Sequence, residues 1–275
     1  PVNATGHADM VQTAEGEWWA VFLGVRSYDE KYVNTGRETF LLPVTWKDGW
    51  PIILSGDAAV PALVKSPAIA SGKVMLEGPE PMTGNFLWRD DFDQPQLKQH
   101  WNRMGTGSSD WLAVDAQEKR LSITAVDSKL TSRTSQPAFV GRRQQHTTYS
   151  ASSELMFPDK EGYSAGVVVL QNEDFHYYLG VQKRPAGHIL FVEQVKKGVV
   201  DRLAEVKLSF GEPQASLILS IEGDQGVLSF AYQIAGAEAV VIAEDLDAKM
   251  LSTEVAGGFV GSHIGMHARL EKAGP

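Results

Sequence analysis

The chain has 275 residues, of which 43% are hydrophobic and 21% charged, with no cysteine and a net charge of −9. The lack of cysteine excludes disulfides and thiol catalysis, and the acidic balance argues against a nucleic-acid surface, which needs clustered Lys and Arg. No apolar run approaches the roughly 20 residues that span a bilayer, and no signal-peptide pattern is visible. We expect neither a nucleic-acid nor a membrane partner. A cytoplasmic location is favoured over a secreted one, which stays open because many secreted bacterial proteins also lack cysteine.

Short strand patterns dominate residues 1–60. Residues 6–13, 18–25, 36–44 and 51–54 are predicted strands, and Asp48-Gly49 is a predicted hairpin turn before the last of them. Residues 18–25 are apolar throughout, which predicts burial on both faces, whereas residues 26–35 form a polar loop with two tyrosines. Sixty residues of strand without a covering helix leave unpaired edges. We therefore expect them to pack on the rest of the chain or to belong to a larger array of sheets.

The composition changes twice after residue 60. Residues 61–84 hold four prolines and no sustained periodicity, which predicts an extended connector. Residues 85–275 contain many strand-like runs between turn signals, with one helical candidate at 244–252. These features predict an antiparallel β-sandwich, whose expected strands are 111–114, 120–124, 138–140, 149–156, 164–171, 176–182, 188–194, 203–209, 215–222, 227–234, 239–243 and 258–270.

Three stretches carry specific motifs. They are Gly-His-Ala-Asp-Met-Val-Gln-Thr at 6–13, Asn-Thr-Gly-Arg-Glu-Thr-Phe-Leu-Leu-Pro-Val at 34–44 with Asp-Gly-Trp-Pro at 48–51, and a C-terminal set with Trp-Arg-Asp-Asp-Phe at 88–92 and Gly-Gly-Phe-Val-Gly at 257–261. Together they resemble glycoside hydrolase family 43, the β-xylosidase and α-L-arabinofuranosidase group. The resemblance implies an all-β fold: the last blades of a five-bladed β-propeller at 1–60, a connector at 61–84, and a concanavalin-A-like sandwich (jelly roll) at 85–275.

The resemblance also implies a function. Two-domain members of the family are exo-acting, inverting glycoside hydrolases that release xylose or arabinose from xylo-oligosaccharides or arabinosides. Their three catalytic carboxylates precede the segment that resembles residues 6–13, so we expect no catalytic residue in this chain and no hydrolysis by it alone. The expected partners are the sugar substrate, the N-terminal catalytic portion of the same enzyme and further copies of the chain. No cofactor is expected to be required, and calcium is a candidate ligand.

His7 and Arg37 are candidate substrate-binding residues. The resemblance places His7 at the bottom of the sugar pocket, as a partner of the carboxylates or a water-mediated calcium ligand, and the alternative is a turn histidine bonded to backbone. Arg37 is expected to contact the non-reducing sugar, because a guanidinium is a planar fork of donors and favours an ionised carboxylate nearby. Its alternative is an ion pair with Glu38 or Asp48. Glu38 itself is expected to be structural, since neighbours on a strand face opposite sides.

Phe259 is the third candidate substrate-binding residue. In the two-domain xylosidases that the chain resembles, a loop of the sandwich places an aromatic ring at the pocket wall, and Gly257, Gly258 and Gly261 supply the backbone freedom for such a loop. The alternative is a core phenylalanine at a strand start. Asp90-Asp91 is either a calcium site or a charged turn. His263 and His267 share one face of a strand, but the sequence offers no third zinc ligand.

A non-catalytic carbohydrate-binding module is the alternative function. A β-sandwich of this kind needs exposed aromatic side chains on a concave sheet, and Phe175, Tyr177 and Tyr178 are the candidates. The motif at 34–51 would then have no purpose. The sequence leaves open the choice between xylose and arabinose, because the walls that decide it lie outside these residues.

Overall fold

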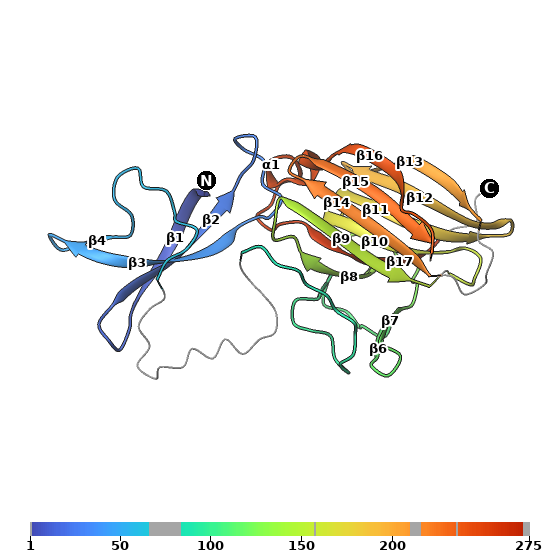
Figure 1. Ribbon diagram of the computed structural model, residues 1–275, viewed down its shortest axis with the longest axis horizontal. Coiled ribbons are helices and arrows are strands. Elements are labelled where there is room, and N and C mark those ends of the chain that lie inside the picture. The colour runs from blue at the N-terminus through green and yellow to red at the C-terminus, as the bar shows by residue number, and fades with distance from the viewer. Residues whose placement is uncertain (1, 66–83, 157, 210–215, 235, 272–275) are drawn as a thin grey trace. The chain divides into compact units, whose positions relative to one another are not determined.

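The computed structural model describes residues 2–65, 84–156, 158–209, 216–234 and 236–271, which belong to two compact units (Figure 1). The first unit comprises Pro1–Ser27 and Arg37–Asp90, and the second comprises Tyr28–Gly36 and Asp91–Pro275. The segment Tyr28–Gly36 thus belongs to the second unit, although it connects two strands of the first. The boundaries at residues 60 and 85 stay predictions.

The first unit is a four-stranded antiparallel sheet whose strands are neighbours in chain order (Figure 1). Its strands are β1 (Val2–Gln12), β2 (Trp18–Arg26), β3 (Glu38–Lys47) and β4 (Trp50–Ile52). Asp48 and Gly49 join the last two strands with φ values of 50° and 81°. Two successive left-handed residues are what a tight type I′ hairpin requires, so the predicted Asp-Gly turn is confirmed.

One face of this sheet is partly exposed. In β2, Trp19, Ala20 and Phe22 are buried, but Val21 is 40% exposed and pairs with Leu41 of β3, which is 41% exposed. The prediction that residues 18–25 are buried on both faces is therefore wrong at Val21. The uniform apolar pattern of β2 matches a strand covered on both sides. Trp19 and Val21 are two residues apart and share one face, which is covered at Trp19 and exposed at Val21.

The second unit is a β-sandwich of two antiparallel sheets, with a separate β6–β7 hairpin (Figure 1). The larger sheet has seven strands in the order β13-β12-β11-β10-β17-β8-β5, and the smaller has four in the order β16-β15-β14-β9. The strands are β5 (Asn102–Arg103), β6 (Leu112–Asp115), β7 (Arg120–Ile123), β8 (Ala138–Arg143), β9 (Thr148–Leu155), β10 (Tyr163–Asn172), β11 (Phe175–Arg184), β12 (Gly187–Lys196), β13 (Val199–Leu208), β14 (Leu217–Asp224), β15 (Val227–Ile234), β16 (Val240–Asp247) and β17 (His263–Leu270).

The seven-stranded sheet buries apolar side chains on both of its faces. The main core lies between the sheets and includes Val167, Tyr177 and Leu190 of the larger sheet with Leu219 and Phe230 of the smaller one. A second cluster occupies the outer face and comprises Leu130, Phe139, Val168, Leu170, Tyr178, Ile189 and Phe191. Successive strand residues point to opposite faces, so β10, β11 and β12 are buried along almost their whole length.

The helix predicted at 244–252 is wrong. β16 runs as far as Asp247, and a 3-10 turn (Ala248–Leu251) and a single α-helical turn, α1 (Thr253–Ala256), follow it. The Asp247 carboxylate accepts a hydrogen bond from the Lys249 amide and so caps the 3-10 turn. Within the described ranges, no helix is long and apolar enough to cross a membrane.

Candidate functional site

His7 lies in an irregular part of β1. The register of β1 with β2 shifts between Asn3 and Gly6 and again between Gly6 and Asp9. His7 itself has φ 49°, a left-handed value that is uncommon outside glycine, and its side chain is exposed. Bulges of this kind redirect a side chain away from strand alternation, so the direction of the imidazole is set by the irregularity.

Arg37 immediately precedes β3 and is half-buried. Its neighbour Glu38 binds Arg26, with both carboxylate oxygens 2.7 Å from guanidinium nitrogens. These hydrogen bonds raise the pKa of Arg26 and give Glu38 a structural partner. The alternative pairing of Arg37 with Asp48 is wrong, because the ten residues of β3 separate them by roughly 30 Å of extended chain.

The register of the sheet brings His7 and Arg37 to the same end of β2. Gly6 pairs with Leu23 on one side of β2, and Glu38 pairs with Gly24 on the other. Neighbouring strands lie about 4.8 Å apart, so Gly6 and Glu38, on the two sides of β2, are about 10 Å from each other. The first unit therefore places His7 and Arg37 near the same end of its sheet. That the two side chains bind the same sugar stays a prediction.

Phe259 lies in the loop of residues 257–262, hereafter the Phe259 loop, between α1 and β17. Its side chain is 65% exposed, so the alternative of a core phenylalanine at a strand start is wrong. Gly257 and Gly258 have φ values of 78° and 80°, and the Val260 carbonyl accepts a hydrogen bond from Gln171 at 2.8 Å. Phe259 belongs to the second unit, whereas His7 and Arg37 belong to the first. That all three line one sugar pocket stays a prediction.

The aromatic side chains proposed for a binding face of the sandwich are buried. Tyr177 is 0%, Tyr178 1% and Phe175 7% exposed. Tyr177 also donates to the Asp247 carbonyl at 3.2 Å, and burial is the main reason that its pKa rises to about 12. A carbohydrate-binding module built on exposed rings at these positions is therefore wrong.

No group of three or more His, Asp or Glu side chains is arranged to hold a metal ion in the described part of the chain. His267 is 1% exposed and its Nδ1 lies 2.9 Å from the Ala138 carbonyl oxygen. Burial lowers the pKa of His267 to about 3, which keeps the ring neutral at physiological pH. Calcium at His7 or at Asp90-Asp91 stays a prediction.

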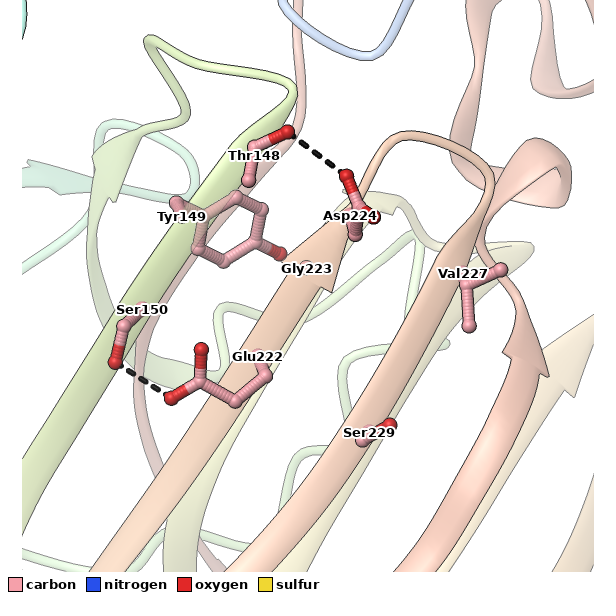
Figure 2. A pocket seen from close by; sticks show the side chains of 8 residues that line it. All are labelled: Thr148, Tyr149, Ser150, Glu222, Gly223, Asp224, Val227 and Ser229. Atoms are coloured by element: carbon pink, nitrogen blue, oxygen red, sulfur yellow. Dashed lines mark hydrogen bonds between the residues drawn. The ribbon is translucent and has the colours of Figure 1, made fainter.

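A shallow hollow on the sandwich lies over β9, β14 and β15 and has a volume of about 450 Å³ (Figure 2). Its carboxylates are engaged by hydroxyls, with Ser150 donating to Glu222 at 2.6 Å and Thr148 to Asp224 at 2.9 Å. Glu222 and Asp224 are two residues apart on β14, so they share one face of the strand. None of the predicted site residues lines this hollow.

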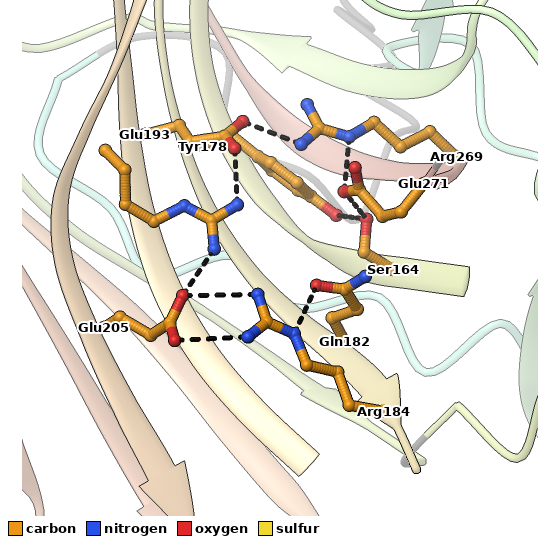
Figure 3. Close-up of polar contacts among 9 residues, drawn as sticks. Ser164, Tyr178, Gln182, Arg184, Glu193, Glu205, Arg269 and Glu271 are labelled. Atoms are coloured by element: carbon orange, nitrogen blue, oxygen red, sulfur yellow. Dashed lines mark hydrogen bonds and ion pairs between the residues drawn. The ribbon is translucent and has the colours of Figure 1, made fainter. Parts of the chain in front are cut away.

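A charged network crosses the outer face of the seven-stranded sheet (Figure 3). Glu193 accepts from Arg202 and from Arg269, each at 2.7 Å. Burial by itself raises the pKa of Glu193, but the two arginines outweigh it and hold the pKa below its usual range. The Arg202 guanidinium also lies 3.8 Å from the centroid of the Phe191 ring. The Arg202 side chain therefore covers the buried Phe191 ring while its guanidinium pairs with Glu193.

The burial of the second half of the segment Tyr28–Gly36 was not predicted from the sequence. The stretch 26–35 has the composition of a surface loop, yet Val33, Asn34 and Thr35 are at most 4% exposed. The tyrosines and the Asn-Thr-Gly sequence before β3 are the only local signals. The partners of these residues lie more than a hundred positions away, for example Arg143 and Ala248.

The fold described above defines an all-β protein, with a single four-stranded antiparallel sheet in one unit and a β-sandwich in the other. Residues 89–274 match the beta xylosidase C-terminal concanavalin A-like domain, and residues 1–51 match glycosyl hydrolases family 43. The chain belongs to glycoside hydrolase family 43. The family and the predicted fold class, propeller strands followed by a concanavalin-A-like sandwich, are thereby confirmed.

Relatives match the chain along nearly all of its length. It is 34% identical over 271 residues to the non-reducing end alpha-L-arabinofuranosidase BoGH43B of Bacteroides ovatus, covering 98% of this chain and 48% of that relative. It is 30% identical to a xylosidase/arabinosidase of Butyrivibrio fibrisolvens, covering 98% and 49%. The crystal structure of a GH43_12 protein retrieved from capybara gut metagenome superposes with a TM-score of 0.83 at 30% identity, covering 96% and 48%. The chain thus spans about half the length of the curated relatives it matches.

Proposed function

We propose that this chain is the C-terminal half of an exo-acting glycoside hydrolase that releases arabinose or xylose from the non-reducing end of xylo-oligosaccharides or arabinosides. The observation that carries the proposal is the match over 98% of the chain to an alpha-L-arabinofuranosidase and to a xylosidase/arabinosidase. The exposed apolar side chains Val21 and Leu41 on one face of the four-stranded sheet support it, because a propeller blade packs against its neighbour through such side chains.

The proposed chemistry is direct displacement with inversion. In that reaction one carboxylate activates a water, another carboxylic acid protonates the leaving oxygen, and the two stand roughly 6.5–9.5 Å apart. These carboxylates are proposed to lie outside the 275 residues, because in the family that the chain resembles they precede the segment that corresponds to residues 6–13. By itself, the chain is then expected not to hydrolyse glycosides.

Each candidate residue of this chain has a separate proposed task. Arg37 donates hydrogen bonds to the hydroxyls of the terminal sugar and favours the ionised form of a nearby catalytic carboxylate. His7 binds the same sugar or the carboxylates from β1. The 65% exposed ring of Phe259 stacks on the C–H face of the sugar and limits the pocket to one or two residues.

A chimera tests the proposal. The N-terminal half of the Bacteroides ovatus relative, up to the point where the match begins, is joined to residues 1–275 and assayed with aryl α-L-arabinofuranoside and aryl β-D-xyloside. We expect hydrolysis of at least one substrate, and a drop of about 100-fold in kcat/KM for Arg37→Ala, which is about 2.7 kcal/mol of transition-state stabilisation.

Lys47→Ala is the matched control, because Lys47 is an exposed cation at the opposite end of β3. Its kcat/KM is expected to stay within twofold of the parent chimera. A folded, soluble chimera that hydrolyses neither substrate contradicts the glycosidase assignment. An active chimera that is indifferent to Arg37→Ala contradicts the role of Arg37 alone.

A further inference from the structure

The segment Tyr28–Gly36, hereafter the inserted segment, is built into the sandwich by backbone and side-chain hydrogen bonds. The Val33 carbonyl accepts from the Thr253 amide at 2.9 Å, and the Asn34 carbonyl accepts from the Ser262 amide at 2.8 Å. The Thr35 carbonyl accepts from Arg143 at 3.0 Å. Three consecutive carbonyl groups are thus bonded to three different parts of the second unit.

Asn34 makes the central side-chain hydrogen bonds between the inserted segment and the rest of the second unit. Its side chain is 2% exposed, accepts from the Tyr28 hydroxyl at 2.9 Å and donates to the Ala248 carbonyl at 2.9 Å. An amide satisfies both roles at once, whereas a carboxylate lacks the donor and an aliphatic side chain lacks both. Leaving the Ala248 carbonyl and the Tyr28 hydroxyl buried without partners is costly, so the site selects asparagine.

The inserted segment meets the Phe259 loop at backbone contact distance. Gly36 forms an antiparallel bridge with Val260, and a Cβ added at Gly36 would lie 2.7 Å from the Val260 carbonyl carbon. A Cβ added at Gly261 would lie 2.9 Å from the Asn34 carbonyl oxygen and closer still to the Thr35 carbonyl. The backbones of the inserted segment and the Phe259 loop therefore approach this closely only because Gly36 and Gly261 have no side chain.

We infer that the inserted segment fixes the Phe259 loop, with Asn34 as the positioning residue that orients the exposed Phe259 ring. The loop is held at Val260 by Gln171 and at Ser262 by Asn34 and by the Gln144 amide at 2.8 Å. The Asn34 carbonyl and the Gly36–Val260 bridge both come from the stretch that immediately precedes Arg37 in the chain. The purpose given to the Phe259 ring rests on the proposed function, whereas the mechanical coupling does not.

The coupling is tested on the 275-residue chain without any sugar. 4-Fluorophenylalanine is placed at position 259, and its ¹⁹F signal is recorded together with amide hydrogen exchange of residues 258–262. Asn34→Ala is expected to move the ¹⁹F shift toward that of free 4-fluorophenylalanine and to accelerate exchange of the Ser262 amide by at least tenfold. Exchange in β11 is expected to stay unchanged, which a general loss of stability would not allow.

Asn102→Ala is the matched control, since it removes one side-chain hydrogen bond of an exposed asparagine in the same unit. It is expected to leave both signals unchanged. If Asn34→Ala does not fold, Arg143→Lys is tested instead. Lysine keeps one charged donor for the Thr35 carbonyl but loses the second hydrogen bond that the guanidinium donates. The ¹⁹F shift is then expected to lie between those of the wild type and free 4-fluorophenylalanine. Unchanged signals in the folded variants overturn the inference. An inactive chimera with an ordered Phe259 loop would instead contradict the proposed function.

Discussion

Buried histidines are the residues whose charge state depends most on the fold. His176 is 2% and His267 1% exposed, and Nδ1 of each ring lies within hydrogen-bond distance of a backbone carbonyl. Burial is the largest cause that lowers their pKa values, to about 4 for His176 and about 3 for His267, and nearby Arg269 contributes to both. Both rings are neutral in the folded protein at pH 6.

Acid should therefore begin to destabilise the sandwich at a pH above that at which most carboxylates titrate. The ordinary histidine pKa is 6.5, so the unfolded chain binds a proton at each ring below that pH while the folded chain does not. The contribution of the two neutral histidines to the free energy of unfolding is fully present above pH 6.5. It is lost as the pH falls toward 4, at about 1.4 kcal/mol per pH unit for each ring.

Urea unfolding of the wild type and of His267→Asn at half-unit steps from pH 8 to pH 4 measures this slope. In the variant, the unfolded state is expected to bind about one proton fewer relative to the folded state than in the wild type. The slope of the free energy of unfolding against pH should therefore be smaller by about 1.4 kcal/mol per pH unit between pH 6 and pH 4. Equal slopes for the two proteins would show that His267 is protonated in the fold.

At the residue scale, the sequence identified candidates but not their surroundings. His7, Arg37 and Phe259 were found by motif. That Phe259 is exposed and Tyr178 is buried follows from which segments cover them, and those segments lie far away in the chain. Glu38 illustrates the same limit: its partner Arg26 is twelve residues away and becomes a neighbour through the pairing of β2 with β3.

At the element scale, the sequence predicted which central runs form strands better than it predicted which faces of those strands are buried. The runs 164–171, 176–182 and 188–194 correspond to β10, β11 and β12, which are the central strands of the sandwich. Their continuous apolar character is typical of strands covered on both faces. That signal was available for Tyr177 and Tyr178, which are adjacent in β11, point to opposite faces and are both buried.

The close pairing of β10 with β11 gives a prediction for Gly166→Ala. Gly166 pairs with Gly180, and a Cβ at Gly166 would lie 2.8 Å from the Gly180 Cα and closer to the Leu179 carbonyl oxygen. Because backbone cannot move aside as a side chain does, we expect a loss of about 1–3 kcal/mol in the free energy of unfolding.

Gly226→Ala is the matched control for this substitution. Its Cβ would lie 2.7 Å from the Lys249 side chain, which is long and able to rotate away. Urea unfolding is expected to show a change below about 1 kcal/mol for Gly226→Ala. A Gly166→Ala protein as stable as the wild type would mean that the two central strands separate easily at this point.

At the scale of the whole molecule, the two units are not contiguous in sequence. The inserted segment lies between β2 and β3 of the first unit and is packed into the second. A chain of residues 85–275, the predicted sandwich domain, therefore lacks a part of its own packing. It leaves the Ala248 carbonyl and the amides of Thr253 and Ser262 without the partners that the inserted segment supplies.

We expect residues 85–275 to be less stable than the same residues with the inserted segment present. The loss of about four hydrogen bonds and of the buried Tyr28 and Val33 side chains is worth several kcal/mol, of which about 2–4 comes from the hydrogen bonds. A synthetic peptide of residues 27–37 added in trans should raise the urea midpoint in a concentration-dependent way. A scrambled peptide of the same composition is the control, and equal midpoints with both peptides would contradict the prediction.

The sequence by itself determined the family, the all-β class and the candidate residues, because strand periodicity, turn residues and short motifs are local properties of the chain. Only the tertiary structure decided which side chains are covered: it buried Tyr177 and Tyr178, exposed Phe259, and buried Val33, Asn34 and Thr35 of the inserted segment. The physical reason is that burial of a polar loop depends on its hydrogen-bond partners. For Asn34 the partner carbonyl belongs to Ala248, 214 residues further along the chain.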